Sequence, residues 1–119
     1  MSSQPEQLRE RTKALALRII RLYRSLPYRT DTQVLGKQLL RCGTSVAANY
    51  RAVCRARSKA EFVARMGIVV EEADEAILWL ELMTESGIVS LTKTEALLKE
   101  ANELTSIFSA SQRTARNVA

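Results

Sequence analysis

The sequence predicts an all-α protein folded as an antiparallel up-down-up-down four-helix bundle. The composition is rich in helix formers, with only two Pro, four Gly and 5% aromatic residues. Apolar residues recur at spacings of three and four in four segments, as on amphipathic helices. The connections between these segments are short, so consecutive helices must run antiparallel. Because 119 residues suit one core, we expect a single domain over residues 1–119, with a frayed polar tail after about residue 109.

The first helix is expected to begin near Pro5, since proline is favoured in the first turn, and to stop at Pro27. Its apolar side chains form one stripe for burial against the other helices. That stripe contains Leu8, Leu15, Ile19, Leu22 and Leu26.

The second helix is expected to follow an N-cap at Thr30 or Asp31. Small residues within it indicate close approach of another backbone, namely Gly36, Gly43 and Ala47. Cys42 and Cys54 lie on this helix about 18 Å apart, too far for a disulfide, and we expect both to be buried thiols. The apolar stripe contains Leu35, Leu39, Cys42, Val46, Asn49 and Val53.

Capping-box patterns predict the starts of the third and fourth helices. Ser58 followed by Glu61 indicates a break at residues 57–58, and Thr92 followed by Glu95 indicates the next start. Gly87 is a natural end for the third helix. The third stripe contains Phe62, Met66, Val69, Ala73, Ala76, Leu80 and Met83, and the fourth contains Leu97, Ala101, Leu104 and Phe108.

Charge is distributed unevenly along the chain. Residues 1–65 contain 14 Lys and Arg against 4 Asp and Glu, whereas residues 66–119 contain 4 against 9. Such asymmetry indicates either a surface that binds polyanions or pairing of basic helices with an acidic helix, within or between chains. We interpret the acidic segment 71–81 as a hydrated or partner-facing surface.

The residues argue against common catalytic chemistry. The chain contains no His, so it lacks the usual neutral-pH acid-base group and cannot form the Glu-x-x-His pairs of di-iron bundles. No glycine-rich phosphate loop occurs. We therefore expect no enzymatic activity, no cofactor and no bound metal. The polar amino terminus and the lack of an apolar run of about 20 residues predict a cytoplasmic protein outside the membrane.

A basic stripe along the second helix, continued by residues of the first, predicts phosphate binding. Arg11 and Arg24 add to it on the first helix, and Arg57, Lys59 and Arg65 extend it beyond the second. The alternative is a structural or protein-interaction scaffold whose basic face makes subunit or partner contacts. The candidate residues for contacts with RNA or DNA phosphates are Arg18, Arg21, Lys37, Arg41, Arg51 and Arg55.

Three further residues stand out on the apolar stripes. Asn49 is polar within such a stripe, and we expect a buried hydrogen bond there to fix helix register or oligomeric state, with ligand or partner contact as the alternative. Tyr50 and Trp79 are expected to anchor the core or a subunit interface.

Three segments together carry a resemblance to a known family: QLLRCGTSVAANYRA at residues 38–52, then SKAEFVARM, then EEADEAILWLELM. Over residues 18–108 the chain resembles the bacterial four-helix bundle proteins associated with intervening sequences of 23S ribosomal RNA genes. This resemblance implies a ring-like homopentamer without known enzymatic activity and with a role in RNA or DNA binding. Related bundles are accessory proteins of reverse transcriptases in diversity-generating retroelements, where a basic surface engages nucleic acid.

The resemblance also implies a set of signature positions. Many relatives have an acidic residue after the position of Arg51, where this chain has Ala52, so a salt bridge there is not expected. The signature residues are Arg41, Ser45, Asn49, Tyr50 and Arg51 in the second helix, and Glu72, Asp74, Trp79 and Glu81 in the third.

Overall fold

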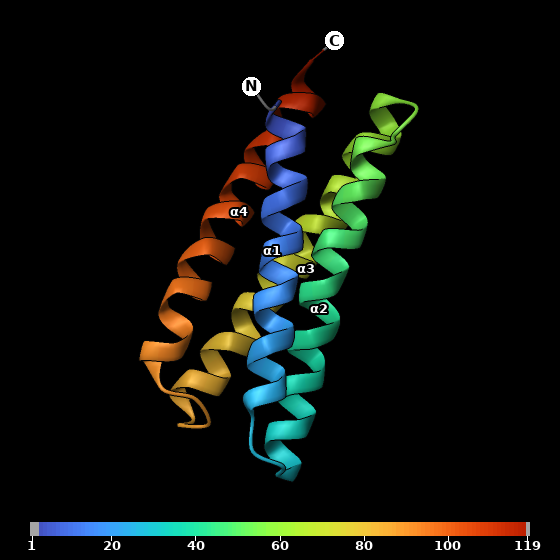
Figure 1. The fold of residues 1–119 in the computed structure, drawn as a ribbon. Coiled ribbons are helices and arrows are strands. Elements are labelled where there is room, and N and C mark those ends of the chain that lie inside the picture. The colour runs from blue at the N-terminus through green and yellow to red at the C-terminus, as the bar shows by residue number, and fades with distance from the viewer. Residues whose placement is uncertain (1–2, 119) are drawn as a thin grey trace.

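The computed structural model describes residues 3–118 and contains four helices: α1 (Gln4–Ser25), α2 (Thr30–Cys54), α3 (Lys59–Glu85) and α4 (Leu91–Asn117). Consecutive helices run in opposite directions and are joined by short connections at residues 26–29, 55–58 and 86–90 (Figure 1). No strand occurs in this described part of the chain. The prediction of an all-α, up-down-up-down bundle is confirmed.

Local sequence signals account for both ends of α3. The Ser58 hydroxyl accepts from the backbone N–H of Glu61 at 3.1 Å, and the Glu61 carboxylate accepts from the backbone N–H of Arg57 at 3.1 Å. These reciprocal bonds satisfy donors that the first turn of α3 leaves free. Gly87 has a φ of 82°, a left-handed conformation that ends α3 as expected.

Two predicted helix starts are wrong by one or two residues. The N-cap of α2 is Arg29, because the Asp31 carboxylate accepts instead from the N–H of its neighbour Thr32 at 2.8 Å. The N-cap of α4 is Ser90, so Thr92 lies inside the helix and its pairing with Glu95 does not form the start.

The residues after 109 form a polar segment as expected, but they are helical and not frayed, because α4 continues to Asn117. The Gln112 amide donates to the carbonyl oxygen of Val63 on α3 at 3.0 Å. This contact fastens the last turns of α4 to the start of α3.

The predicted apolar stripes meet in one core. Tyr50 packs on Phe108 with ring centroids 5.3 Å apart, joining α2 to α4. Cys42 is buried as expected, but Cys54 is exposed, because it lies on the face of the last turn of α2 that points away from the core, whereas Val53 in the same turn is buried. The most deeply buried large side chains include Leu15, Ile19, Leu39, Val46, Met66, Val69, Leu80, Met83, Leu104 and Phe108.

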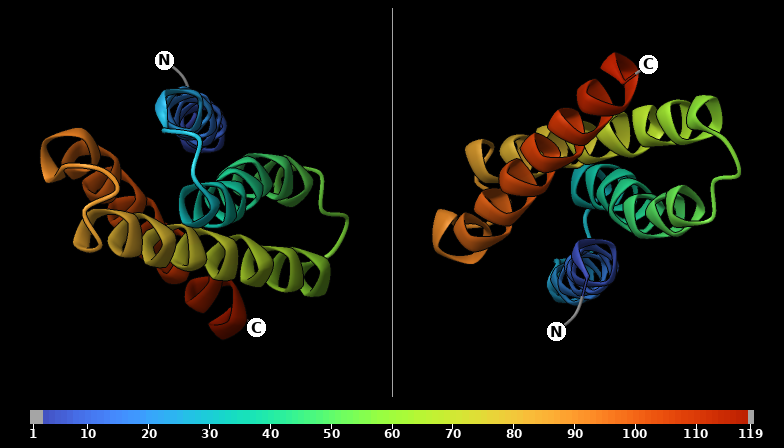
Figure 2. Two further views of the ribbon diagram at one scale, coloured as in Figure 1. Left: turned by 90° about the horizontal axis from the view of Figure 1, so that it is seen from below. Right: turned by 90° about the horizontal axis from the view of Figure 1, so that it is seen from above.

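The helices are packed unevenly. α1 lies along α2 and α4 crosses α3, while α2 and α3 run beside each other (Figure 2). α1 meets α2 most closely at two glycines, as predicted: a Cβ at Gly43 would lie 2.4 Å from Ile19 Cδ1, and one at Gly36 would lie 3.0 Å from Leu26 Cδ1. Away from this end the two helices diverge (Figure 1). Ala47 was expected to permit close approach too, but it lies where the helices have separated.

Candidate nucleic-acid interface

A groove of about 830 Å³ opens where α1 and α2 diverge. Its floor consists of small side chains, Ala16 from α1 and Ala47, Ala48 and Ala52 from α2. Because these side chains end at Cβ, the space between the two helices is left unfilled. We call this hollow the basic groove, after the residues on its walls, which are Arg9, Lys13, Arg51, Arg55, Arg57 and Arg65.

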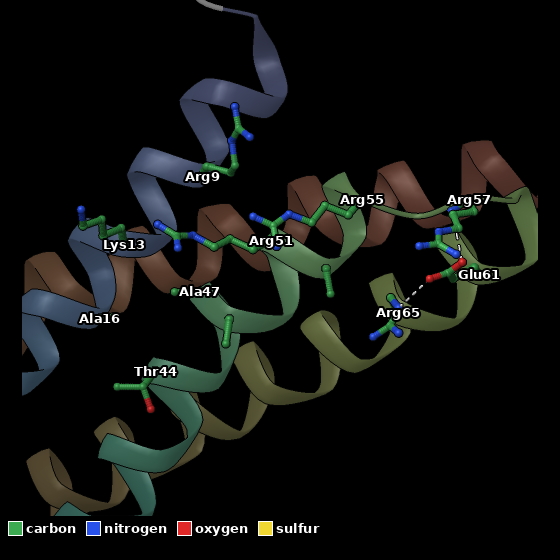
Figure 3. A pocket seen from close by; sticks show the side chains of 12 residues that line it. Arg9, Lys13, Ala16, Thr44, Ala47, Arg51, Arg55, Arg57, Glu61 and Arg65 are labelled. Atoms are coloured by element: carbon green, nitrogen blue, oxygen red, sulfur yellow. Dashed lines mark hydrogen bonds and ion pairs between the residues drawn. The ribbon is translucent and has the colours of Figure 1, made fainter.

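The cations of the basic groove come from three parts of the chain (Figure 3). Arg65 lies on α3, Arg9 and Lys13 lie on α1, and Arg51 and Arg55 lie at the end of α2, where Arg55 is the residue that follows the last turn. Arg9, Lys13, Arg51 and Arg55 also line an adjoining polar hollow, which Glu6 and Glu10 of α1 line as well. Within residues 3–118 none of the four forms an ion pair, so their charges are available to an anionic ligand.

Glu61 is the one carboxylate among the described lining residues of the basic groove. It accepts from the backbone N–H of Arg57 and from Nε of Arg65, both at 3.1 Å. The bond from the Arg57 backbone is the main cause of a lowered Glu61 pKa, with the bond from Arg65 second. Glu61 is therefore ionised and partly neutralises the edge of the groove at Arg65.

Only two of the six predicted phosphate-binding residues, Arg51 and Arg55, line the basic groove. Arg41 lies instead against α3, with Nη1 3.1 Å from Glu72 and Nη2 3.7 Å from Glu75. Its charge is thus already balanced by two carboxylates of the same chain.

The other three predicted residues lie elsewhere. Arg18 is half-buried and helps to lower the pKa of Glu100 on α4, after the larger effect of Arg11. Arg21 and Lys37 are exposed outside the basic groove, and Lys37 lines a small hollow with Tyr28 and Arg29.

Sequence reasoning missed Arg9 and Lys13. Their spacing of four residues, followed by Ala16 three residues later, places all three on one face of α1. That face was recognisable as a stripe, but its position opposite Arg51 and Arg55 depends on how α1 packs against α2. Arg11, which we had included in the basic face, pairs with Glu100 at 2.7 Å and Glu103 at 3.1 Å.

Arg41 also organises a polar cluster between α2 and α3. Sγ of Cys42 and the carboxylates of Glu72 and Glu75 lie within 4.8 Å of one another, a set that could in principle hold a metal ion. The Arg41 guanidinium is already among them, with Nη2 3.2 Å from Cys42 Sγ. Burial raises the pKa of Cys42 to about 11, so its thiol is protonated at neutral pH and is a poor ligand.

The remaining signature residues lie outside the basic groove. The Asn49 amide donates to the carbonyl oxygen and the hydroxyl of Ser45, both at 2.9 Å, so its bonds are within α2. Trp79 is half-buried and packs against the core. Asp74 and Glu81 are exposed on α3.

The fold and the groove define a small helical bundle protein with an exposed basic surface. The chain belongs to the 23S rRNA-intervening sequence protein family, whose model matches residues 6–110. It is similar to a protein of unknown function from the S23 ribosomal protein family of Bacteroides thetaiotaomicron, with 28% identity and a TM-score of 0.86. That similarity covers 93% of this chain and 99% of the other.

A comparison with curated proteins gave no match. None of the helices in the described part of the chain has the length and apolar character needed to cross a membrane.

Proposed function

We propose that this protein is a non-enzymatic, oligomeric module of the cytoplasm that binds RNA or DNA phosphates through the basic groove. The observation that carries the proposal is the group of unpaired cations, Arg9, Lys13, Arg51 and Arg55, facing one hollow from two helices. Contacts between such side chains and phosphates release counterions, which provides affinity without reading sequence.

The residues that we propose to bind phosphate differ from the six predicted from the sequence. Arg51 and Arg55 stay at its centre, while Arg9, Lys13, Arg57 and Arg65 join them. Arg18, Arg21 and Lys37 become peripheral candidates, and Arg41 has a structural role in pairing α2 with α3.

The test is a salt titration of binding to structured RNA, single-stranded RNA and duplex DNA. The native protein is compared with Arg51→Glu/Arg55→Glu and with Lys93→Glu/Lys99→Glu, which makes the same change of charge at two exposed positions of α4 outside the groove. We expect binding at low salt that weakens steeply as salt rises, and that is lost in the groove variant but largely kept in the control. The three proteins must have equal helicity and oligomeric mass. The proposal is wrong if the native protein binds none of the three at low salt.

A second candidate function is a protein-interaction scaffold. On α3 the apolar side chains of Ile68, Leu78 and Leu82 are 42%, 46% and 41% exposed. They are accompanied by exposed acidic residues, among them Glu71 and Glu81. This face is opposite in charge to the basic groove, so the two surfaces are complementary for contacts between subunits or with another protein.

The scaffold candidate predicts a different result from the same variants. The family resemblance implies a homopentamer, whose mass native mass spectrometry would measure directly. If the arginines of the groove pair with acidic α3 of a neighbouring subunit, Arg51→Glu/Arg55→Glu would dissociate the oligomer, and the native oligomer would not bind nucleic acid. An intact oligomer in the variant, with nucleic-acid binding lost, favours the first function.

A further inference from the structure

We infer that the basic groove takes a single-stranded polynucleotide in preference to a duplex, with one sugar-phosphate backbone lying between α1 and α2. This inference rests on the proposed function and specifies the form of nucleic acid that the site accepts.

The width of the groove is the first argument. The contact between Ile19 and Gly43 holds α1 against the middle of α2, and beyond it the two helices diverge towards the end that carries Arg9 and Arg55 (Figure 1). Packed helices are about 8–10 Å apart, so a gap that widens from such a contact admits one backbone. A duplex is much wider and would stay on the rim, where it reaches only the outermost side chains.

The floor of the groove is the second argument. Ala47, Ala48 and Ala52 leave space on α2 directly beside Arg51 and Arg55. Arg9 and Lys13 line this space from α1, and the side chains of Arg51 and Arg55 extend over it from the end of α2 toward α1 (Figure 3). The phosphates of a strand in this space would therefore be neutralised from both helices, which a duplex on the rim could not achieve.

The chemistry of the lining predicts little discrimination among single strands. None of the described lining residues is aromatic, so bases have no ring on which to stack. The carboxylate of Glu61 already accepts from Arg57 and Arg65 at the edge of the groove, and no other described lining residue carries a carboxylate that would favour a ribose 2′-hydroxyl. We therefore expect single-stranded RNA and single-stranded DNA to bind about equally well.

The test uses fluorescence anisotropy of the native protein with labelled oligo(U), oligo(dT) and a mixed-sequence duplex of the same length. Both single strands should bind at least about fivefold more tightly than the duplex at low salt, with a salt slope of about −0.7 per phosphate neutralised. Equal or tighter binding of the duplex, still dependent on Arg51 and Arg55, would overturn this inference while the proposed function stands. Absence of binding by all three would overturn both.

A steric variant separates shape from charge. Ala48→Leu adds bulk to the floor at an exposed position without changing any charge. It should weaken single-strand binding several-fold and leave duplex binding unchanged, because a duplex on the rim does not reach the floor. Ala96→Leu, at an exposed position of α4 outside the groove, is the matched control. If Ala48→Leu binds single strands as tightly as the control does, the strand does not lie on the floor and the inference is wrong.

Discussion

Gly43 on α2 faces Ile19 on α1 so closely that a Cβ at position 43 would lie 2.4 Å from Ile19 Cδ1 and 3.2 Å from its Cγ2. Ile19 is completely buried, so it has little room to move away. The contact therefore determines where α1 and α2 converge. Because the basic groove begins about one turn beyond this point, at Ala16 and Ala47, a core glycine helps to shape an exposed surface.

We expect Gly43→Ala to destabilise the protein by about 1 kcal/mol. Overpacking costs about 1–3 kcal/mol, and the better helix propensity of alanine offsets about 1 kcal/mol. Urea unfolding measures the change. Gly43→Ala should lower the free energy of unfolding by less in an Ile19→Val background, because valine lacks Cδ1. Gly67→Ala is the comparison, because its Cβ would meet only the amide end of Gln112, at 2.9 Å, and the change costs at most the one hydrogen bond from that amide to Val63. A Gly43→Ala protein as stable as the native one would contradict the close contact.

The ion pair between Arg11 and Glu100 joins α1 to α4 and should make stability depend on pH. Arg11 Nη2 and Nε donate to the two carboxylate oxygens at 2.7 and 3.1 Å, and the bond from Arg11 is the main cause of the lowered Glu100 pKa. An unfolded Glu has a pKa of about 4.3. The stabilisation is therefore fully present above that pH and is lost as pH falls through the lower pKa of the folded state.

Glu100→Gln should accordingly cost about 1 kcal/mol at pH 7, since the pair is partly exposed. The difference from the native protein should disappear in strongly acidic solution. Urea titrations at neutral and acidic pH measure both values. Glu95→Gln is a matched control on the same helix, because Glu95 forms no ion pair within residues 3–118. An equal loss at both pH values would show that Glu100 stabilises through packing and not through its charge.

The fold was predictable because its signals are local. The apolar stripes and the Ser58–Glu61 cap depend on residues within a turn or two of each other. The end of α4 was not predictable in this way, since the Gln112 amide bonds to Val63, 49 residues away. Exposure of Cys54 likewise depends on which face the last turn of α2 presents to the other helices, since Val53 in the same turn is buried.

The candidate site was predictable only in part, because contacts between helices decide which of its residues are available. Helical spacing places Arg41, Arg51 and Arg55 on one basic stripe, and nothing within α2 distinguishes them. The packing of α3 does so, because Glu72 lies 3.1 Å from Arg41 and leaves the other two unpaired. Arg9 becomes part of the groove because α1 diverges from α2, and the sequence of α1 alone does not show that divergence.

The two cysteines should differ sharply in reactivity. Burial raises the pKa of Cys42 to about 11 and shields it, so it stays a protonated thiol, whereas Cys54 is exposed. The native protein should therefore take up one equivalent of iodoacetamide rapidly and a second only after unfolding, as read by mass spectrometry. Cys54→Ser should abolish labelling of the native protein. Persistence of rapid labelling in Cys54→Ser would mean that Cys42 is accessible.

Removing the negative charge of Glu61 should strengthen binding of single strands. In Glu61→Gln the amide oxygen can still accept from the Arg57 backbone N–H, so the start of α3 is preserved. The Arg65 guanidinium, now held by Glu61 at 3.1 Å, is released to face the groove. Anisotropy titrations should show higher affinity at low salt and a salt slope steeper by about 0.7, the value for one further phosphate contact on a single strand.

The source of that gain can be isolated with a double variant. In an Arg65→Gln background, Glu61→Gln should no longer steepen the salt slope, because the cation that it releases is absent. Any remaining gain in affinity would then reflect the loss of repulsion between Glu61 and phosphate alone. Weaker binding by Glu61→Gln, with α3 intact by circular dichroism, would contradict this account, since it would mean that the ion pair holds Arg65 where the strand needs it.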